Sequence, residues 1–327
     1  MTMLTFAGLS AAAALAFANG ANDISKSIAT LVGSGEADYK RAVILTSLAV
    51  ASGAVLAAVW AVKMTLLFTN GMLTAQAQVT QLFALSVLAG AIGWVLFATR
   101  SGLPVSTTHA IVGSVIFTAV CAFGSNSVAW AGVAKKVLLP LFLSPVLALG
   151  LAYALFKALF WICREKYCLN CHWAHWLSAM SSGFARGLND TPKIAALGLV
   201  FYFLAGSAQV APGWFFLVLA AANALGGIVM GFKVTDTLAY KMVKFDHLEG
   251  LTANLATSVL TIGAPVHGVP VSTTHVSSSA ILGMGLRNGT GAVNWKVAGE
   301  ILAAWLITLP AAGIIGAASY WALKLVL

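Results

Sequence analysis

Residues 102–109 read GLPVSTTH, and residues 268–275 read GVPVSTTH. A second pair of similar stretches precedes them, GANDISKSIATLVGS at residues 20–34 and GLNDTPKIAALGLVF at residues 187–201. The two pairs occur in the same order, and their spacings along the chain differ by one position. Self-similarity of this kind indicates an internal repeat. The sequence therefore predicts two related halves.

The composition places these halves in a membrane. The chain has 327 residues, of which 60% are hydrophobic and 8% are charged, and its mean hydropathy is +0.93. A soluble globular domain carries about 25% charged residues, so this chain has too few polar groups to cover a surface in water. Several apolar runs reach the length of about 20 residues that a helix needs to cross a bilayer. We predict an all-α polytopic protein of the cell (inner) membrane.

Each half divides into five apolar elements. The halves are residues 1–165 and 166–327, which we expect to form one functional unit. The elements are 1–33, 43–62, 82–98, 103–123 and 137–162 in the first half, and 176–206, 213–232, 251–266, 269–286 and 297–325 in the second. Gly, Asn, Asp or Pro interrupt the first and fourth elements of each half, which predicts broken or re-entrant helices. An odd number of crossings per half inverts the second half, and inverted repeats with discontinuous helices meeting at the bilayer midplane are typical of secondary transporters.

The charge and the N-terminus have ordinary membrane explanations. The formal net charge is +9, and basic residues near the ends of spans set orientation and meet anionic lipid. No basic run or aromatic platform indicates nucleic-acid binding. Met1–Ala18 is apolar, but no basic residue precedes Lys26, so we expect the first half of a broken helix rather than a secretory signal.

The Asn-Asp stretches place carboxylates among apolar residues. At a helix centre each of Asp23 and Asp190 costs about 2.5–3.5 kcal/mol on insertion scales, and ionisable residues inside membranes mark functional sites. Gly20 and Gly187 are expected to loosen the helix ahead of them. Carboxylates, amide oxygens and freed carbonyls are hard ligands suited to a small cation such as Na⁺. The simpler alternative is a polar pair that joins two helices.

The PVSTTH stretches offer hydrogen-bond donors. Pro104 and Pro270 suit the first turn of a helix, and the end of a helix that exposes backbone N–H groups favours anions. Two such ends facing each other would hold a tetrahedral oxyanion, unless the hydroxyls only cap the helices. His109 and His275 are expected to fix the hydroxyls by hydrogen bonds. The hydroxyl residues are Ser106, Thr107, Thr108, Ser272, Thr273 and Thr274.

At these four stretches the chain closely resembles the inorganic phosphate transporter (PiT) family of secondary carriers. Its members carry a GANDVANA-like and a PVSTTH-like motif in each of two inverted halves, and the match covers nearly the whole chain. The resemblance implies phosphate uptake by symport with Na⁺ or H⁺, commonly as a homodimer. It implies that Asn22, Asp23, Asn189 and Asp190 bind the coupling cation and the substrate. It also implies that the six hydroxyl residues hold the phosphate.

The chain departs from the family pattern after each aspartate. Lys26 and Lys193 lie three residues after Asp23 and Asp190, on the same helix face. Each ammonium would pair with the carboxylate where a sodium-coupled relative holds Na⁺, which favours proton coupling or an altered stoichiometry over plain sodium symport. Alternatively, the lysines extend along the helix to the interface. Arg186 is expected either to bind the anion bidentately or to balance Asp190.

The link between the halves reads CREKYCLNCHWAHW. Cys168, Cys171, His172 and His175 have the spacing of a compact metal site, and C-x-x-C-H is also a haem attachment pattern. Four ligands within eight residues strain a tetrahedral zinc site, and free thiols in a reducing compartment are the simpler interpretation. We expect no cofactor apart from the coupling ion.

Three functions are consistent with these features. The first is a cation-coupled phosphate symporter, and the second is a permease for another tetrahedral anion such as sulfate. Phosphate donates a proton near neutral pH and sulfate does not, so buried carboxylates favour phosphate. The third is a metal- or redox-responsive membrane protein that uses the C-x-x-C-H segment. An enzyme is not indicated, because no nucleophile–base pair or phosphate-cleaving motif is present.

Overall fold

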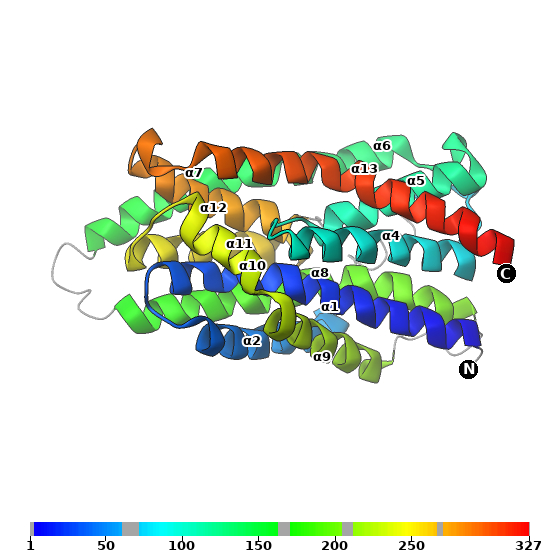
Figure 1. Ribbon diagram of the computed structural model, residues 1–327, viewed down its shortest axis with the longest axis horizontal. Coiled ribbons are helices and arrows are strands. Elements are labelled where there is room, and N and C mark those ends of the chain that lie inside the picture. Colours follow the sequence, from blue (N-terminus) through cyan, green and yellow to red (C-terminus); the bar gives the residue numbers. More distant parts are fainter. Residues whose placement is uncertain (1–2, 61–71, 163–170, 205–211, 267–270, 327) are drawn as a thin grey trace.

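A computed structural model describes residues 3–60, 72–162, 171–204, 212–266 and 271–326. Within these ranges the chain is helical and forms no strand beyond two isolated bridges, Leu73 with Val128 and Val243 with Val293. The long helices lie roughly along one axis of the molecule (Figure 1). The predicted all-α fold is confirmed.

The two repeats contain corresponding elements. The first repeat holds α1 (Met3–Gly33), α2 (Tyr39–Trp60), α4 (Gln81–Arg100), α5 (Thr107–Phe123), α6 (Trp130–Gly132) and α7 (Leu139–Ile162). The second holds α8 (Cys171–Leu204), α9 (Gly213–Met230), α10 (Phe232–Asp236), α11 (His247–Val266), α12 (Thr273–Arg287) and α13 (Trp295–Val326). Short 3₁₀ and π turns cover Ser125–Ser127, Val133–Leu138, Thr237–Met242 and Thr290–Ala292.

Several of these helices suit a bilayer. Six of the described helices are long and apolar enough to cross a membrane, namely α1, α2, α4, α7, α9 and α13. The outer surfaces of α7, α9 and α13 expose large apolar side chains such as Val146, Val229 and Leu306. Exposed apolar surface of this extent is unfavourable in water but favourable against lipid.

Two helical hairpins enter the bundle from opposite ends (Figure 1). The chain runs inward along α4, turns after Arg100 and returns along α5. The helices α11 and α12 form the second hairpin, which enters from the other end of the molecule. The fourth element of each half is therefore re-entrant, as its sequence predicted.

The first element of each half differs from the prediction. Both α1 and α8 run without a break through the Asn-Asp stretch, so the expected interruption, with residues 1–18 as a separate half-helix, is wrong. The glycines serve close packing instead. A Cβ on Gly20 would lie 1.8 Å from the carbonyl oxygen of Asn223 in α9, and one on Gly187 would lie 2.0 Å from that of Val50 in α2. The first helix of each repeat thus packs against the second helix of the other.

The two first helices run in opposite directions (Figure 1). This antiparallel arrangement is what an inverted repeat requires. It brings the Asn-Asp stretches of α1 and α8 and the starts of α5 and α12 to the same central level, although they are far apart in the sequence.

Candidate functional site

Five charged side chains are buried together in the centre of the bundle. Unpaired charges at this depth are costly, so such residues pair with one another or with backbone carbonyls. The five lie on the two antiparallel helices α1 and α8. They are Asp23 (3% exposed), Lys26 (1%), Arg186 (1%), Asp190 (2%) and Lys193 (0%).

Each lysine pairs with the aspartate that precedes it on its own helix. Nζ of Lys26 lies 2.9 Å from Oδ1 of Asp23, and Nζ of Lys193 lies 2.7 Å from Oδ1 of Asp190. The alternative in which the lysines extend to the interface is therefore wrong. Arg186 donates from Nη1 to Oδ1 of Asp23 at 2.7 Å, so it balances that residue and not Asp190, whose cation is Lys193.

Both ammonium groups have the same three kinds of oxygen partner. Each is bound by a carboxylate from its own helix, by a backbone carbonyl from one hairpin tip and by a threonine hydroxyl from the start of α5 or α12. All three donors of each ammonium are therefore used. The further contacts are Lys26 to the oxygens of Val105 (3.0 Å) and Thr274 (2.6 Å), and Lys193 to those of Val271 (3.3 Å) and Thr108 (2.8 Å).

One hydroxyl lies between the two carboxylates. Oγ1 of Thr273 is 3.1 Å from Oδ1 of Asp23 and 3.1 Å from Oδ2 of Asp190. A hydroxyl has one proton to donate, so it satisfies both carboxylates at once only if one of them carries a proton. Its counterpart Thr107 makes no such hydrogen bond within the described part of the chain.

The serine hydroxyls act as helix caps. Oγ of Ser106 accepts from the backbone N–H of His109 at 3.2 Å, and Oγ of Ser272 accepts from that of His275 at 3.1 Å. Pro104 precedes the cap and lies outside the helix, which corrects the predicted first-turn position, because the serine supplies the cap itself. Pro270 lies outside the described residues.

The two asparagines contact the hairpin tips. Oδ1 of Asn22 accepts from the backbone N–H of Val105 at 3.0 Å, and its Nδ2 donates to the carbonyl of Leu103 at 3.0 Å. Nδ2 of Asn189 donates to the carbonyl of Val271 at 3.4 Å, while its buried Oδ1 has no partner in the described part of the chain. Asn22 therefore fixes its hairpin tip more completely than Asn189 does.

Arg186 has a donor to spare. Its Nε donates to Oγ of Ser27 at 2.8 Å, whereas its Nη2 has no partner among the described residues. Ser27 was not predicted, because a serine in an apolar helix carries no distinctive signal.

A stack of rings closes the site between the hairpins. The rings of His109 and His275 lie 4.4 Å apart, and Trp305 stacks on His275 at 4.0 Å. Nε1 of Trp305 also donates to the carbonyl of Pro104 at 3.2 Å. Trp305 comes from α13, outside both sequence motifs, so only the tertiary fold identifies it.

The predicted metal ligands are only partly described. Cys168 lies outside the described residues, and His172 and His175 lie in the first turns of α8, far along that helix from the central charges. His175 is buried, with Nε2 3.1 Å from Oγ1 of Thr30.

Comparisons with known proteins agree with this architecture. A model of the phosphate transporter family matches residues 19–173 and, a second time, residues 164–316. The chain is 30% identical to a protein of Bacillus subtilis named probable low-affinity inorganic phosphate transporter, over 100% of this chain and 99% of that one. It is also 30% identical to a protein of the same name from Mycobacterium leprae, over 96% of this chain and 77% of the other.

A solved structure has the same fold. The structure titled "The sodium-dependent phosphate transporter" superposes with a TM-score of 0.88 at 25% identity, covering 100% of both chains.

Proposed function

Because this chain belongs to the phosphate transporter family, we propose that it takes up inorganic phosphate by symport with protons at the central cluster of charges. The family consists of multi-pass membrane transporters, in bacteria of the cell membrane, and not of enzymes. The observation that carries the proposal is the charge balance of the cluster. Three cations face two carboxylates, and the spare donor belongs to one of the cations, Arg186.

The surplus positive charge suits a singly charged phosphate. With both carboxylates ionised, a monoanion bound beside Arg186 would neutralise the cluster, and hydrogen bonds to an ionised partner are the strong ones. The Thr107 hydroxyl and the N-terminal ends of α5 and α12 supply further donors close by. We propose that the substrate site consists of Asn22, Ser106, Thr107, Thr108, Asn189, Ser272, Thr273 and Thr274. Within it, the serines and Asn22 act by fixing the hairpin tips.

The lysines favour protons over Na⁺ as the coupling ion. Each ammonium already sits among a carboxylate, a carbonyl and a hydroxyl, the hard oxygen ligands that a small metal cation prefers. A tethered cation at each position makes a free Na⁺ unnecessary there. We therefore assign coupling to Asp23 and Asp190, with Lys26 and Lys193 as resident cations. The solved relative is named sodium-dependent. We propose that this chain differs from it in using protons as the coupling ion.

The Thr273 bridge supplies a place for the transported proton. Two carboxylates joined through one hydroxyl hold a proton more readily than a single carboxylate does, because the nearby like charge disfavours ionisation of both. Coupling is needed because each charge moved through 100 mV is worth about 2.3 kcal/mol. A phosphate monoanion entering a negative cell faces about 2.3 kcal/mol at that potential, which one proton cancels, and a second proton lets the potential drive uptake.

Both repeats are required for this site. Lys26 contacts Thr274, Lys193 contacts Thr108, and Arg186 contacts Asp23, so each of these three cations has a partner in the other repeat. We propose that residues 1–165 and 166–327 act as one functional unit. The resemblance to the family supports a homodimer of such units.

Uptake of radiolabelled phosphate into proteoliposomes tests the proposal. We expect an imposed pH gradient to drive uptake, a Na⁺ gradient alone to drive none, and excess sulfate not to compete. Uptake driven by Na⁺ at constant pH would overturn the assignment of protons as the coupling ion, but phosphate would remain the transported substrate. Absence of uptake under both gradients, or strong competition by sulfate, would overturn the cargo as well.

A further inference from the structure

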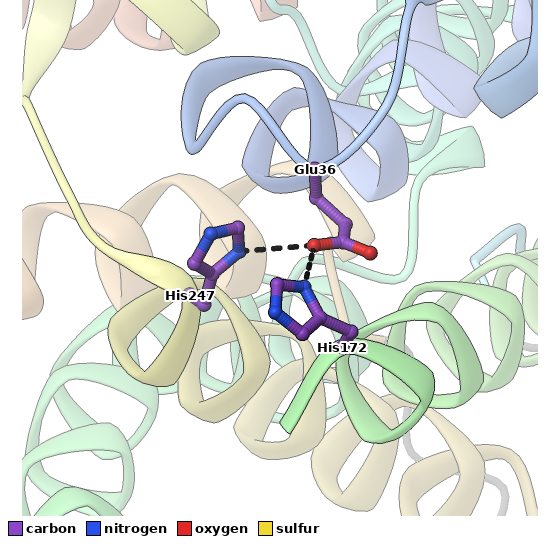
Figure 2. A group of neighbouring side chains, drawn as sticks. All are labelled: Glu36, His172 and His247. Atoms are coloured by element: carbon purple, nitrogen blue, oxygen red, sulfur yellow. Dashed lines mark hydrogen bonds and ion pairs between the residues drawn. The ribbon is translucent and has the colours of Figure 1, made fainter. Parts of the chain in front are cut away.

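A glutamate and two histidines converge at one end of the bundle, away from the central charges (Figure 2). Glu36 lies in the loop between α1 and α2, His172 in the first turn of α8, and His247 at the start of α11. Nδ1 of His172 hydrogen-bonds to Oε2 of Glu36, and Nδ1 of His247 lies 3.2 Å from the same oxygen. One ligand atom from each of the three residues lies within 4.8 Å of the others.

Two imidazole nitrogens and one carboxylate oxygen form a recognised ligand set for divalent transition metals. Zn²⁺ binds nitrogen at about 2.0–2.1 Å and carboxylate oxygen at about 2.0–2.2 Å, so ligands around a tetrahedral ion lie roughly 3.4 Å apart. Small side-chain rotations bring the three atoms from their present separations to that spacing. Three protein ligands leave a fourth position for water.

The carboxylate is held in place by a neighbour outside the ligand set. Nε1 of Trp176 donates to Oε1 of Glu36 at 3.1 Å, which leaves Oε2 directed at the histidines. The guanidinium of Arg41 lies over the Trp176 ring, 5.4 Å from its centre. Outer partners of this kind orient metal ligands and strengthen binding.

Metal ligands must be deprotonated, so an entering ion would take the place of the protons that lie between Glu36 and the two histidines. The histidines are accessible to an entering ion, with 60% of the His172 side chain and 37% of the His247 side chain exposed.

We propose that Glu36, His172 and His247 form a binding site for a divalent transition-metal ion of the zinc class. The set differs from the one that the sequence predicted, because it takes His172 alone from the C-x-x-C-H segment. His175 is directed to Thr30 through Nε2. The two further ligands are distant in the sequence, because Glu36 comes from the loop after α1 and His247 from the start of α11.

The position of the site means that a bound ion would connect α1 with α8. Glu36 follows α1, which carries Asp23, while His172 begins α8, which carries Asp190. An ion bound to both would link the first helix of one repeat to the first helix of the other at one end of the molecule. Because binding favours the linked state, Zn²⁺ stabilises the folded protein by RT ln(1 + c/Kd), where c is the free Zn²⁺ concentration.

Zinc binding to the purified full-length protein, stripped of metal, tests the proposal without reference to transport. We expect one Zn²⁺ per chain by titration calorimetry, and unchanged binding in the double variant C168S/C171S. Loss of an outer partner costs roughly 10- to 100-fold in affinity, which we expect for Trp176→Phe. Glu36→Gln, which keeps the shape of the side chain, and His247→Ala should each weaken binding more than Trp176→Phe does.

Cobalt(II) provides a second measurement that needs no variant. Co²⁺ bound to two imidazoles and a carboxylate shows weak visible bands, whereas a cysteine ligand adds an intense thiolate-to-metal band. We expect the weak bands alone. Absence of Zn²⁺ binding, a thiolate band, or loss of binding in C168S/C171S but not in Glu36→Gln would each overturn the proposal.

Discussion

Arg186 of the second repeat donates to Asp23 of the first repeat across 2.7 Å, with only 1% and 4% of the two side chains exposed to solvent. Lys26 donates to the same carboxylate oxygen at 2.9 Å. Asp23 therefore has two cations, whereas Asp190 has one. If Arg186 turned toward a bound anion, Lys26 would still pair with Asp23. The surplus charge can thus serve a substrate without leaving a carboxylate unpaired in the core.

The role of the spare Nη2 of Arg186 in binding phosphate can be tested by a substitution that keeps the positive charge. Arg186→Lys loses the planar fork, and a hydrogen bond to a charged group contributes about 1.5–3 kcal/mol. We expect the KM for phosphate uptake to rise roughly 10- to 100-fold. Arg287→Lys is the matched control, because Arg287 pairs with Glu249 away from the centre. Equal KM values in the two variants would contradict the role of Arg186.

The role of the lysines as resident cations can be tested by removing one ammonium from the oxygen atoms that bind it. In Lys26→Ala the oxygens of Asp23, Val105 and Thr274 lose the ammonium that they share. Because these oxygens suit a small hard cation, we expect phosphate uptake by this variant to become stimulated by Na⁺, while wild-type uptake is indifferent to it. The measurement is uptake at fixed pH as NaCl replaces choline chloride.

A lysine outside the cluster provides the control for that experiment. Lys233 donates to the carbonyl of Arg100 near the surface, so Lys233→Ala should stay indifferent to Na⁺. If Lys26→Ala transports phosphate without any response to Na⁺, the Lys26 ammonium of the wild-type protein does not occupy the place of a metal cation.

The threonines at corresponding positions separate coupling from binding. Thr273→Val removes the hydroxyl that joins Asp23 and Asp190, and we expect it to abolish uptake driven by a pH gradient but to leave measurable exchange of phosphate at equilibrium through the other residues of the substrate site. Thr107→Val removes a hydroxyl offered to substrate, so it should reduce both activities, by roughly tenfold for a hydrogen bond of about 1.5 kcal/mol. The same defect in both variants would argue against a proton site at Thr273.

The sequence predicted those parts of the site that depend on local spacing. A lysine three residues after an aspartate shares its helix face, so the pairing of Lys193 with Asp190 was one of the two arrangements that the sequence indicated. Repetition of the motifs predicted that the two halves meet. These inferences needed no knowledge of how the helices pack.

Contacts between the repeats were not predictable in the same way. Arg186 was expected either to bind the anion or to balance the neighbouring Asp190, because the sequence gives proximity along a helix and not across helices. Gly187 was interpreted as a helix breaker for a related reason. Its function depends on the backbone of α2, which lies opposite it only in the folded protein. Glu36 and His247 lack any shared motif, and only the fold brings them together.

The packing role of Gly187 leads to a prediction about stability. An alanine Cβ there would lie 2.0 Å from the carbonyl oxygen of Val50 and 2.7 Å from the backbone nitrogen of Ala54. Small residues allow this close approach of membrane helices, and overpacking typically costs about 1–3 kcal/mol. We therefore expect Gly187→Ala to lower the free energy of unfolding by that amount, measured by denaturant titration in detergent micelles.

Gly299 offers a matched comparison within a helix of the same protein. It lies on the exposed side of α13, and a Cβ there would meet nothing within 4 Å. Gly299→Ala should leave stability unchanged or raise it by up to about 1 kcal/mol, the difference in helix propensity between the two residues. If glycine instead loosened α8 at residue 187, alanine would strengthen the helix and both variants would be stabilised. Opposite signs for the two substitutions therefore distinguish close packing from helix unwinding.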